Sequence, residues 1–296
     1  MNLKRIILSC FAFLFASTFA FSQDIEELVS KYTEANGKGY MQPLADAFGA
    51  TFNTGLFHSA KIKKPGFQAY LGVITSTAFI SDKRKTFTAT TQDFTDPEIS
   101  AEVPTIFGPA EPVNVENPEN NLVYVFPAGM NVRMVPMIVP QLSLGSVYGT
   151  DLTLRFFTYN IGEDFGKLNL FSWGLRHSIS QYLDMLPLDA AIGIYHQSFK
   201  VGDIISANSW VVNAQASKKI LLFTFYGGIG YENVKLDLEY HNDEEDVDIT
   251  FNLKGKNSVR IIAGVTFNFG PAKLNIDYNI ANQSTLGIGL GVGIGK

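Results

Sequence analysis

The C-terminal stretch 258–296 constrains the fold more than any other part of the chain. Large apolar residues alternate with small or polar ones along three successive runs, 259–269, 272–281 and 284–295. A period of two is typical of β-strands, because successive side chains point to opposite faces of a sheet. Gly270-Pro271 and a second short connection join the runs, so neighbouring strands must be antiparallel. The stretch therefore predicts three antiparallel strands that share one wholly apolar face.

The two faces of these strands suit different surroundings. One face carries Arg260, Lys273, Asp277 and several asparagines, whereas the other carries large apolar side chains and no charge. An apolar face of this size either packs on a second sheet or meets lipid. A soluble β-sandwich therefore stays open as an alternative to a transmembrane barrel.

The N-terminus predicts export. Two basic residues, Lys4 and Arg5, precede an apolar run that ends near Phe21 with small residues suited to cleavage. This pattern is typical of a secretory signal peptide over residues 1–22, because the run is short for the ~20 residues of a spanning helix. Cys10, the single cysteine, lies inside this segment. The exported chain is therefore expected to have no disulfide, which a chain of this length does not need.

Composition narrows the fold and the partners. The chain is 13% aromatic, contains 26 glycines and carries a net charge of −5, so nucleic acid is not an expected partner. After the signal segment no apolar run reaches the length of a spanning helix. Such an exported, strand-rich chain predicts a transmembrane β-barrel in the cell outer membrane, because closure satisfies every backbone group. Its expected partners are outer-membrane lipid and the barrel-assembly machinery.

Residues 23–60 form the helical part of the exported chain. Apolar residues recur at helical spacing over 25–32, and Pro43 suits the first turn of a second short helix, with Gly37 and Gly39 separating the two. A helical segment cannot form part of a barrel wall. It must lie in the periplasm or fill the lumen as a plug, and we favour the plug.

The wall is assigned to residues 61–296, interrupted by a long loop at 95–121 that is rich in Pro, Asn, Glu and Ser. Strands before this loop are expected over 66–80 and 85–94, and 123–126 could restart the wall. Nine further strands are expected over 138–147, 150–159, 166–179, 187–198, 204–217, 219–241, 247–269, 272–281 and 284–295.

Parity sets the strand number. If both termini are periplasmic the number is even, so nine late strands need an odd number before them. We predict an all-β, antiparallel up-and-down barrel of 12 strands, with 14 as the alternative, and a short helical N-terminal plug-like segment. Strands 219–241 and 247–269 exceed the ~9–11 residues needed to cross a bilayer. They should project well beyond the membrane.

Charged residues on the polar faces of the strands are candidates for a site in the lumen. The six residues predicted to face the lumen are Asp151, Arg155, Arg176, Arg260, Lys273 and Asp277. They could bind or steer a solute. They could also form ion pairs that hold a plug or brace the wall, and we favour this structural role.

Glycines on the last strand form a second candidate feature. Gly287, Gly289, Gly291 and Gly293 leave a strip without side chains on the inner wall. Such a strip lets a bulky group approach the backbone closely. We expect the N-terminal segment or a ligand to contact it.

The chain offers little for catalysis or metal binding. His177 lies near a strand end, where Ser178 or Ser209 could be its partner, but the sequence has no Gly-x-Ser-x-Gly and no phosphate loop. The acidic tip 241–248 could bind a divalent cation, yet its spacing matches no calcium loop and suits a solvated turn. We expect neither an enzyme nor a metal site, and no cofactor.

Several phrases of the sequence resemble one group of barrels. The phrases are ATFNTGLFHSA at 50–60, VPQLSLG at 139–145 leading into GTDLTLR at 149–155, and WGLRHSI at 173–179. They are similar to a family of Bacteroidetes-type outer-membrane barrels without an assigned activity. The order of elements more distantly resembles the long-chain fatty-acid transporter barrels, whose fold is a 14-stranded barrel with an N-terminal plug. No ligand-binding residue of those transporters can be carried over to a position here.

The sequence thus predicts an outer-membrane barrel for passive uptake or binding of a small solute, with a small hydrophobic ligand as one candidate. A plug inside a mid-sized barrel argues against a wide general pore. Two other classes stay open. One is a non-conducting structural or surface-adhesion barrel, and the other is an outer-membrane lipid hydrolase.

Overall fold

The computed structural model describes residues 34–63, 66–91, 98–119, 121, 123–162, 166–183, 186–242 and 247–295. The predicted signal peptide and the helical spacing at 25–32 lie outside these residues. Within the described part of the chain, no helix combines the length and the apolar character needed to cross a membrane.

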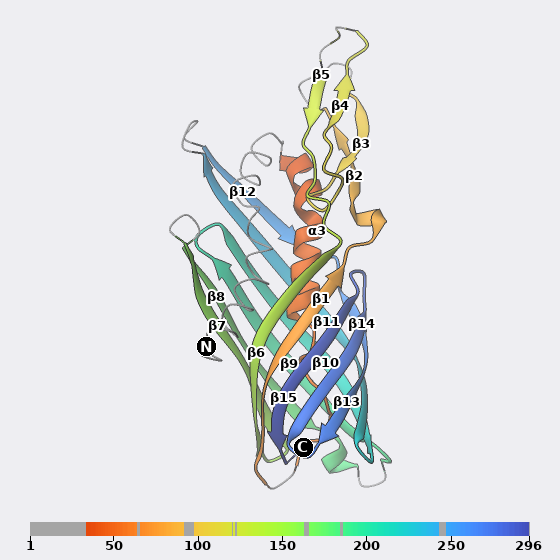
Figure 1. Cartoon of the computed structure of the whole chain (residues 1–296), viewed down its shortest axis with the longest axis vertical. Coiled ribbons are helices and arrows are strands. Elements are labelled where there is room, and N and C mark those ends of the chain that lie inside the picture. Colours follow the sequence, from red (N-terminus) through yellow and green to blue (C-terminus); the bar gives the residue numbers. More distant parts are fainter. Residues whose placement is uncertain are drawn as a thin grey trace, which may run out of the picture.

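In the described residues, ten antiparallel strands close into a barrel (Figure 1). Its sheet follows the order β10-β9-β8-β7-β6-β1-β15-β14-β13-β11, and pairing of β10 with β11 closes the ring. An eleventh strand, β12, extends the hairpin of β11 beyond β13. The strands are β1 (Gln68–Phe79), β6 (Met134–Val147), β7 (Thr150–Gly162), β8 (Gly166–Ser178), β9 (Asp189–Val201), β10 (Ile205–Ile220), β11 (Phe223–Asn242), β12 (Val247–Lys254), β13 (Val259–Phe269), β14 (Ala272–Ile280) and β15 (Thr285–Ile294).

The predicted strand numbers, 12 and the alternative 14, are both wrong. The strands expected from residue 138 onward are present, with β12 and β13 together in place of 247–269. However, a single wall strand, β1, precedes them instead of three or five. The strand number is even, as expected, but fewer strands precede β6 than the sequence predicts.

The overestimate arose from two small hairpins that project above the barrel rim (Figure 1). β2 (Thr86–Thr90) pairs with β3 (Ser100–Pro104), and β4 (Val113–Glu116) pairs with β5 (Val123–Phe126), each pair as a separate sheet. The region expected to be a loop at 95–121 therefore supplies β3 and β4. Strands this short cannot cross a bilayer, which takes ~9–11 residues.

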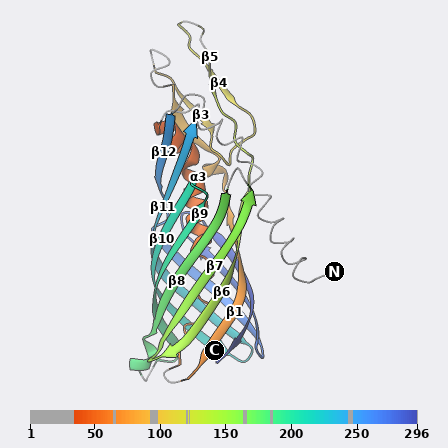
Figure 2. The same ribbon diagram turned by 90° about the vertical axis from the view of Figure 1, so that its left-hand side faces the viewer.

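The barrel has two different ends. The hairpins β2–β5 lie at one end, which we call the hairpin end (Figures 1 and 2). The C-terminus lies at the other end, which we call the turn end, together with short connections such as 147–150 and 269–272.

The polarity of the wall reverses along the height of the barrel. On β11, Phe225, Ile229 and Tyr231 face outward and are exposed, while Glu232 faces inward and is buried. Above that level the pattern reverses, because Leu236 is buried in the lumen and Lys235 is exposed outside. The lower wall thus suits lipid around a polar lumen, and the upper wall suits water around an apolar core.

Strand β8 shows the same reversal. Toward the turn end, the apolar Phe171 and Leu175 are exposed on the outer face and Arg176 is buried in the lumen. Nearer the hairpin end, the apolar Leu170 is buried in the lumen and the polar Asn169 is exposed outside. Aromatic rings gather near this level on three adjacent strands. The rings of Trp173 and Trp210 are 5.7 Å apart, and that of His196 is 4.5 Å from Trp210. Aromatic girdles of this kind mark the lipid–water interface of barrels.

One continuous helix, α3 (Glu34–Phe52), occupies the upper lumen (Figures 1 and 2). The expected break at Gly37 and Gly39 is wrong. A Cβ at Gly37 would lie 2.4 Å from the Phe251 ring, and one at Gly39 would lie 2.4 Å from the Phe87 ring. These glycines therefore let wall and hairpin rings pack against the helix, and this contact outweighs their poor helix propensity.

The apolar core of the protein surrounds this helix. Tyr40, Met41 and Phe52 of α3 belong to one buried cluster with wall residues such as Phe199 and Leu236. Burying about 150–250 Å² per aromatic ring stabilises such packing strongly. The upper barrel is therefore held together much like a soluble domain.

The exposed apolar side chains on the outer face of the lower wall are called the apolar belt, and Leu290 on β15 is one of them. We expect Leu290→Lys to lower the free energy of unfolding in lipid vesicles by about 2–4 kcal/mol, because it places a charge in lipid. Val123→Lys is the matched control, since Val123 is similarly exposed but lies on β5 outside the barrel. The control should change stability by less than about 0.5 kcal/mol. Equal losses in both variants, measured by denaturant unfolding, would contradict a lipid-facing belt.

Candidate functional site

The lumen is occupied by residues 34–60, which we call the plug segment. After α3 the chain continues toward the turn end as an irregular strip. Its contacts follow this descent: the hydroxyls of Thr54 and Thr285 are 2.6 Å apart, and the backbone N–H of Ala60 donates to Ser217 Oγ at 2.9 Å. The segment therefore meets several strands of the wall in turn.

Arg155 on β7 binds the middle of the plug segment. Its guanidinium donates from Nη1 to the carbonyl of Phe52 at 2.8 Å and from Nη2 to the carbonyl of Thr54 at 2.9 Å. Nε donates to Gln141 Oε1 at 2.8 Å. The side chain is 1% exposed, and all of these acceptors are neutral. A buried cation needs such acceptors, so the wall depends on the backbone of the plug.

Arg260 on β13 combines an ion pair with two plug contacts. Its Nε donates to Glu232 Oε2 at 3.0 Å. Nη2 donates to the carbonyl of Ala50 at 3.1 Å, and Nη1 donates to Thr54 Oγ1 at 3.1 Å. Asn53 of the plug also donates to Glu232, at 2.8 Å. The carboxylate of Glu232 thus links the wall arginine to the plug.

Arg176 on β8 makes the lowest of the three contacts. Its Nε donates to Asp151 Oδ1 at 2.8 Å, and Nη2 forms a second bond to the same carboxylate. Nη1 donates to the carbonyl of Ser59 at 2.6 Å. Both charged side chains are almost fully buried. The bidentate ion pair therefore points one guanidinium nitrogen at the plug.

Lys273 and Asp277, the other charged candidates, lie on β14. Lys273 Nζ donates to Asn268 Oδ1 at 2.8 Å, and Asp277 accepts from Tyr226 at 3.2 Å and from Asn279 at 2.6 Å. Within the described residues, neither side chain bonds to the plug segment. These two residues brace the inner wall.

The glycine strip on β15 makes room for two kinds of neighbour. A Cβ at Gly287 would lie 2.8 Å from Thr54 Cγ2 of the plug segment. The inner space beside the other three glycines is taken by wall side chains instead. Gly289 faces Ile74, Gly291 faces Tyr70 and Gly293 faces Lys273.

The structure does not form the Ser–His pair that the sequence allowed. His177 Nδ1 is 2.8 Å from Thr150 Oγ1, and its Nε2 is 2.9 Å from the hydroxyl of Tyr182. Ser209 donates to Asn53 at 2.9 Å inside the lumen, and Ser178 pairs with Ser180. Both serines therefore bond elsewhere.

No metal site is visible in the residues that the structure describes, because no three His, Cys, Asp or Glu side chains gather there. Residues 243–246 of the acidic tip lie outside the described residues.

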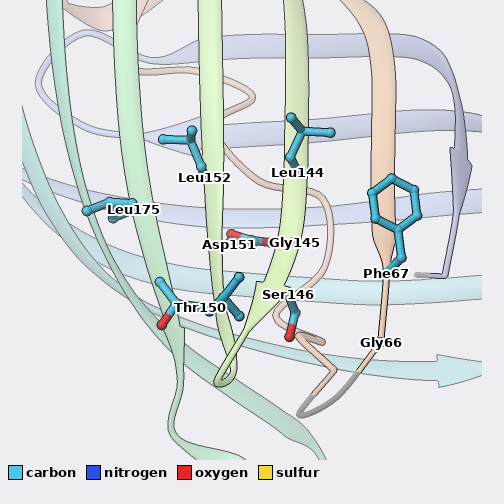
Figure 3. Close-up of a pocket in the computed structure, with 10 residues that line it drawn as sticks. Gly66, Phe67, Leu144, Gly145, Ser146, Thr150, Asp151, Leu152 and Leu175 are labelled. Carbon is cyan, nitrogen blue, oxygen red and sulfur yellow. The ribbon is translucent and has the colours of Figure 1, made fainter.

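An apolar groove of about 680 Å³ lies on the outer wall at the turn end (Figure 3). Phe67, Leu144, Leu152 and Leu175 surround it, and Asp151 lies at its floor. The pairing of β6 with β7 shifts register at this level, between residues 145 and 147. The groove therefore reaches the wall beside the buried pair of Asp151 and Arg176.

Sequence reasoning missed several residues that hold the plug. Glu232 could have been found, because it alternates with the outward Tyr231 and must face the lumen. The ion pair between Arg84 and Asp46, with 2.5 Å from Nη1 to Oδ2, could not. It joins α3 to a 3₁₀ turn, η1 (Asp82–Arg84), and no periodicity relates the two.

We expect Arg176→Gln to lower the free energy of unfolding by about 3–5 kcal/mol, because it leaves the buried Asp151 without its cation. The double variant Asp151→Asn with Arg176→Gln should be more stable than Arg176→Gln alone. The coupling energy between the two positions should be about 1–3 kcal/mol. Trp173 and Trp210 fluorescence during guanidinium unfolding in detergent measures both. Strictly additive losses would argue against a coupled pair.

Comparison with known proteins gives a family. No curated protein matches the sequence. Similar solved structures include a loop L8 deletion mutant of OmpT, an outer membrane protein of Vibrio cholerae, at 9% identity and a TM-score of 0.27 over 77% of this chain and 100% of that chain. The translocator domain of the autotransporter NalP from Neisseria meningitidis shows 11% identity and a TM-score of 0.27 over 78% and 88%. The toluene transporter TbuX of Ralstonia pickettii shows 8% and 0.24 over 84% and 98%.

Values this low assign no solute or mechanism to the chain. The family match is of a different kind, because one family model aligns with residues 1–294. The chain therefore belongs to DUF6588, which is described as a family of unknown function.

Proposed function

We propose that the protein is an outer-membrane barrel that its own plug segment closes at rest, and that it binds or passively admits a small solute when this segment moves. One observation carries the proposal. Arg155, Arg176 and Arg260 donate hydrogen bonds from three different wall strands to plug backbone carbonyls. A lumen occupied in this way suits a gated barrel better than an open pore.

The outward belt supports the membrane location. Its exposed apolar residues include Phe171, Ile192, Val212, Phe225, Ile261, Leu290 and Val292. A soluble protein seldom exposes contiguous apolar surface of this extent. Lipid is the partner that this belt fits, and the polar upper wall then lies in water outside the cell.

The contacts of the three arginines with the plug segment are polar, which supports movement of the end of α3 and of the strip below it. On the plug side the arginines bind backbone carbonyls and one hydroxyl, and water can replace such acceptors when the segment shifts. The external groove at the turn end is apolar. A hydrophobic compound therefore remains one candidate solute, with the groove as a place where it could meet the membrane.

A disulfide lock tests the gating. Thr54→Cys with Thr285→Cys should form a bridge, because the two hydroxyl oxygens are 2.6 Å apart and the exported chain is expected to have no other cysteine. In planar bilayers we expect Arg155→Gln with Arg260→Gln to open more often than the wild type. The lock should suppress openings, and a reductant should restore them.

Each single-cysteine variant serves as a control for the lock. The conductance of each should be the same with and without reductant, because neither can form the bridge. Conductance that is the same in the locked, reduced and arginine variants would overturn the role of the plug segment as a gate.

A second candidate is a non-conducting surface barrel. The projecting hairpin of β4 and β5 favours it, because Val123 and Val125 are exposed at the hairpin end. Replacing residues 113–126 by a short flexible linker should then abolish binding of cells to a surface while leaving barrel folding intact. Adhesion that survives this replacement would argue against the surface role of the hairpin.

A further inference from the structure

A polar cavity of about 310 Å³ lies at the hairpin end, where α3 meets the rim of the barrel. Its lining comes from α3, from the turn η1, from Thr86 and Thr105 of the β2–β3 hairpin region, and from two connections of the barrel rim. Ligand pockets typically measure about 300–1,000 Å³, so this one suits a small ligand.

The lining of this cavity is positively charged. Lys83, Arg84 and Lys256 contribute three cations, and Asp46 contributes one carboxylate. The chain as a whole carries a net charge of −5. A cationic cavity in an acidic protein indicates a preference for anions.

The carboxylate of Asp46 is already engaged. Arg84 Nη1 donates to it at 2.5 Å, and the backbone N–H of Lys256 donates to Oδ1 at 2.7 Å. Its side chain is 1% exposed. Asp46 therefore neutralises part of the charge of Arg84 and leaves the two lysines uncompensated.

Neither lysine has a carboxylate within ion-pair distance in the described residues. Both side chains are exposed to water. Asp82, which precedes Lys83 in the chain, accepts a hydrogen bond from Lys85 at 2.7 Å. This bond lowers the pKa of the Asp82 carboxyl. Asp82 is thus charged but already paired with a lysine outside the cavity.

We infer that this cavity binds a small water-soluble anion, a carboxylate or a phosphate, between Lys83, Lys256 and the free edge of Arg84. A guanidinium has five N–H donors. Two of those on Arg84 bond to Asp46 and to the carbonyl of Asn282. The remaining donors and two ammonium groups can surround an anion. The inference rests on the proposed function, because it names the class of solute that first meets the plug segment.

Binding there acts on the plug directly. Asp46 belongs to α3, and its bond to Arg84 ties the helix to the rim. An anion beside Arg84 competes with Asp46 for the same guanidinium and weakens this tie. The cavity therefore couples solute binding at the mouth to movement of the helix.

Titration calorimetry on the purified mature protein in neutral detergent tests the site, with inorganic phosphate and acetate as separate probes. We expect saturable binding that weakens as salt is added, because two of the three cations are exposed. Lys83→Gln with Lys256→Gln should weaken phosphate binding at least about tenfold, the effect of losing charged hydrogen bonds.

Lys200→Gln with Lys235→Gln is the matched control, because it removes the same charge from two exposed lysines outside the cavity. It should leave binding unchanged. No saturable binding of either probe, or an equal loss in the control, would overturn the site. Calorimetry needs no conductance, so failure of the gating proposal would show separately in the bilayer experiment.

The source of the anion is tested in nanodiscs. Phosphate should bind equally well in nanodiscs of neutral lipid and of anionic phospholipid, because the cavity opens to water at the hairpin end. Loss of phosphate binding in the anionic nanodiscs alone would show that a lipid headgroup fills the cavity, and would overturn a water-soluble ligand.

Discussion

Three buried arginine side chains, Arg155, Arg176 and Arg260, determine how the wall and the plug segment fit together. A guanidinium in the lumen of a closed barrel has lost its water, and the cost of that loss must be offset by acceptors. Arg155 finds them mainly on the plug backbone, whereas Arg176 and Arg260 add one wall carboxylate each. The wall and the plug segment therefore form one polar core, in which the three wall arginines take part of their hydrogen-bond acceptors from the plug.

The reversal of wall polarity explains how one barrel meets two solvents. Below the level of Tyr231 the lumen is polar and the outer face apolar, and above it the lumen is apolar and packs on α3. The arginine contacts lie in the polar half, and the cationic cavity lies beside Arg84 at the rim. The proposed gate and the proposed anion site thus lie at different heights of the same plug segment, so binding at the hairpin end could affect the polar core.

Much of the wall could be predicted from the sequence, because side-chain alternation is local. The outward Phe171 and Leu175 and the inward Arg176 follow from the alternation alone. So do the strands after residue 138, except that the expected strand 247–269 is divided into β12 and β13. The early strand count could not be predicted in this way. Thr86–Thr90 and Val123–Phe126 alternate like wall strands, but their partners lie in the same small hairpins, and pairing is a tertiary property.

The alternation of side chains and the hairpin turns predict antiparallel strands with charged residues on one face, because both signals are local. They favour a closed barrel but leave a two-sheet sandwich open. Three features appear only in the folded protein: closure of the barrel by ten strands in the described residues, the unbroken path of α3 past Gly37 and Gly39, and the contact of Arg84 with Asp46. Each of these depends on contacts between residues far apart in the chain, and local patterns carry no information about such contacts.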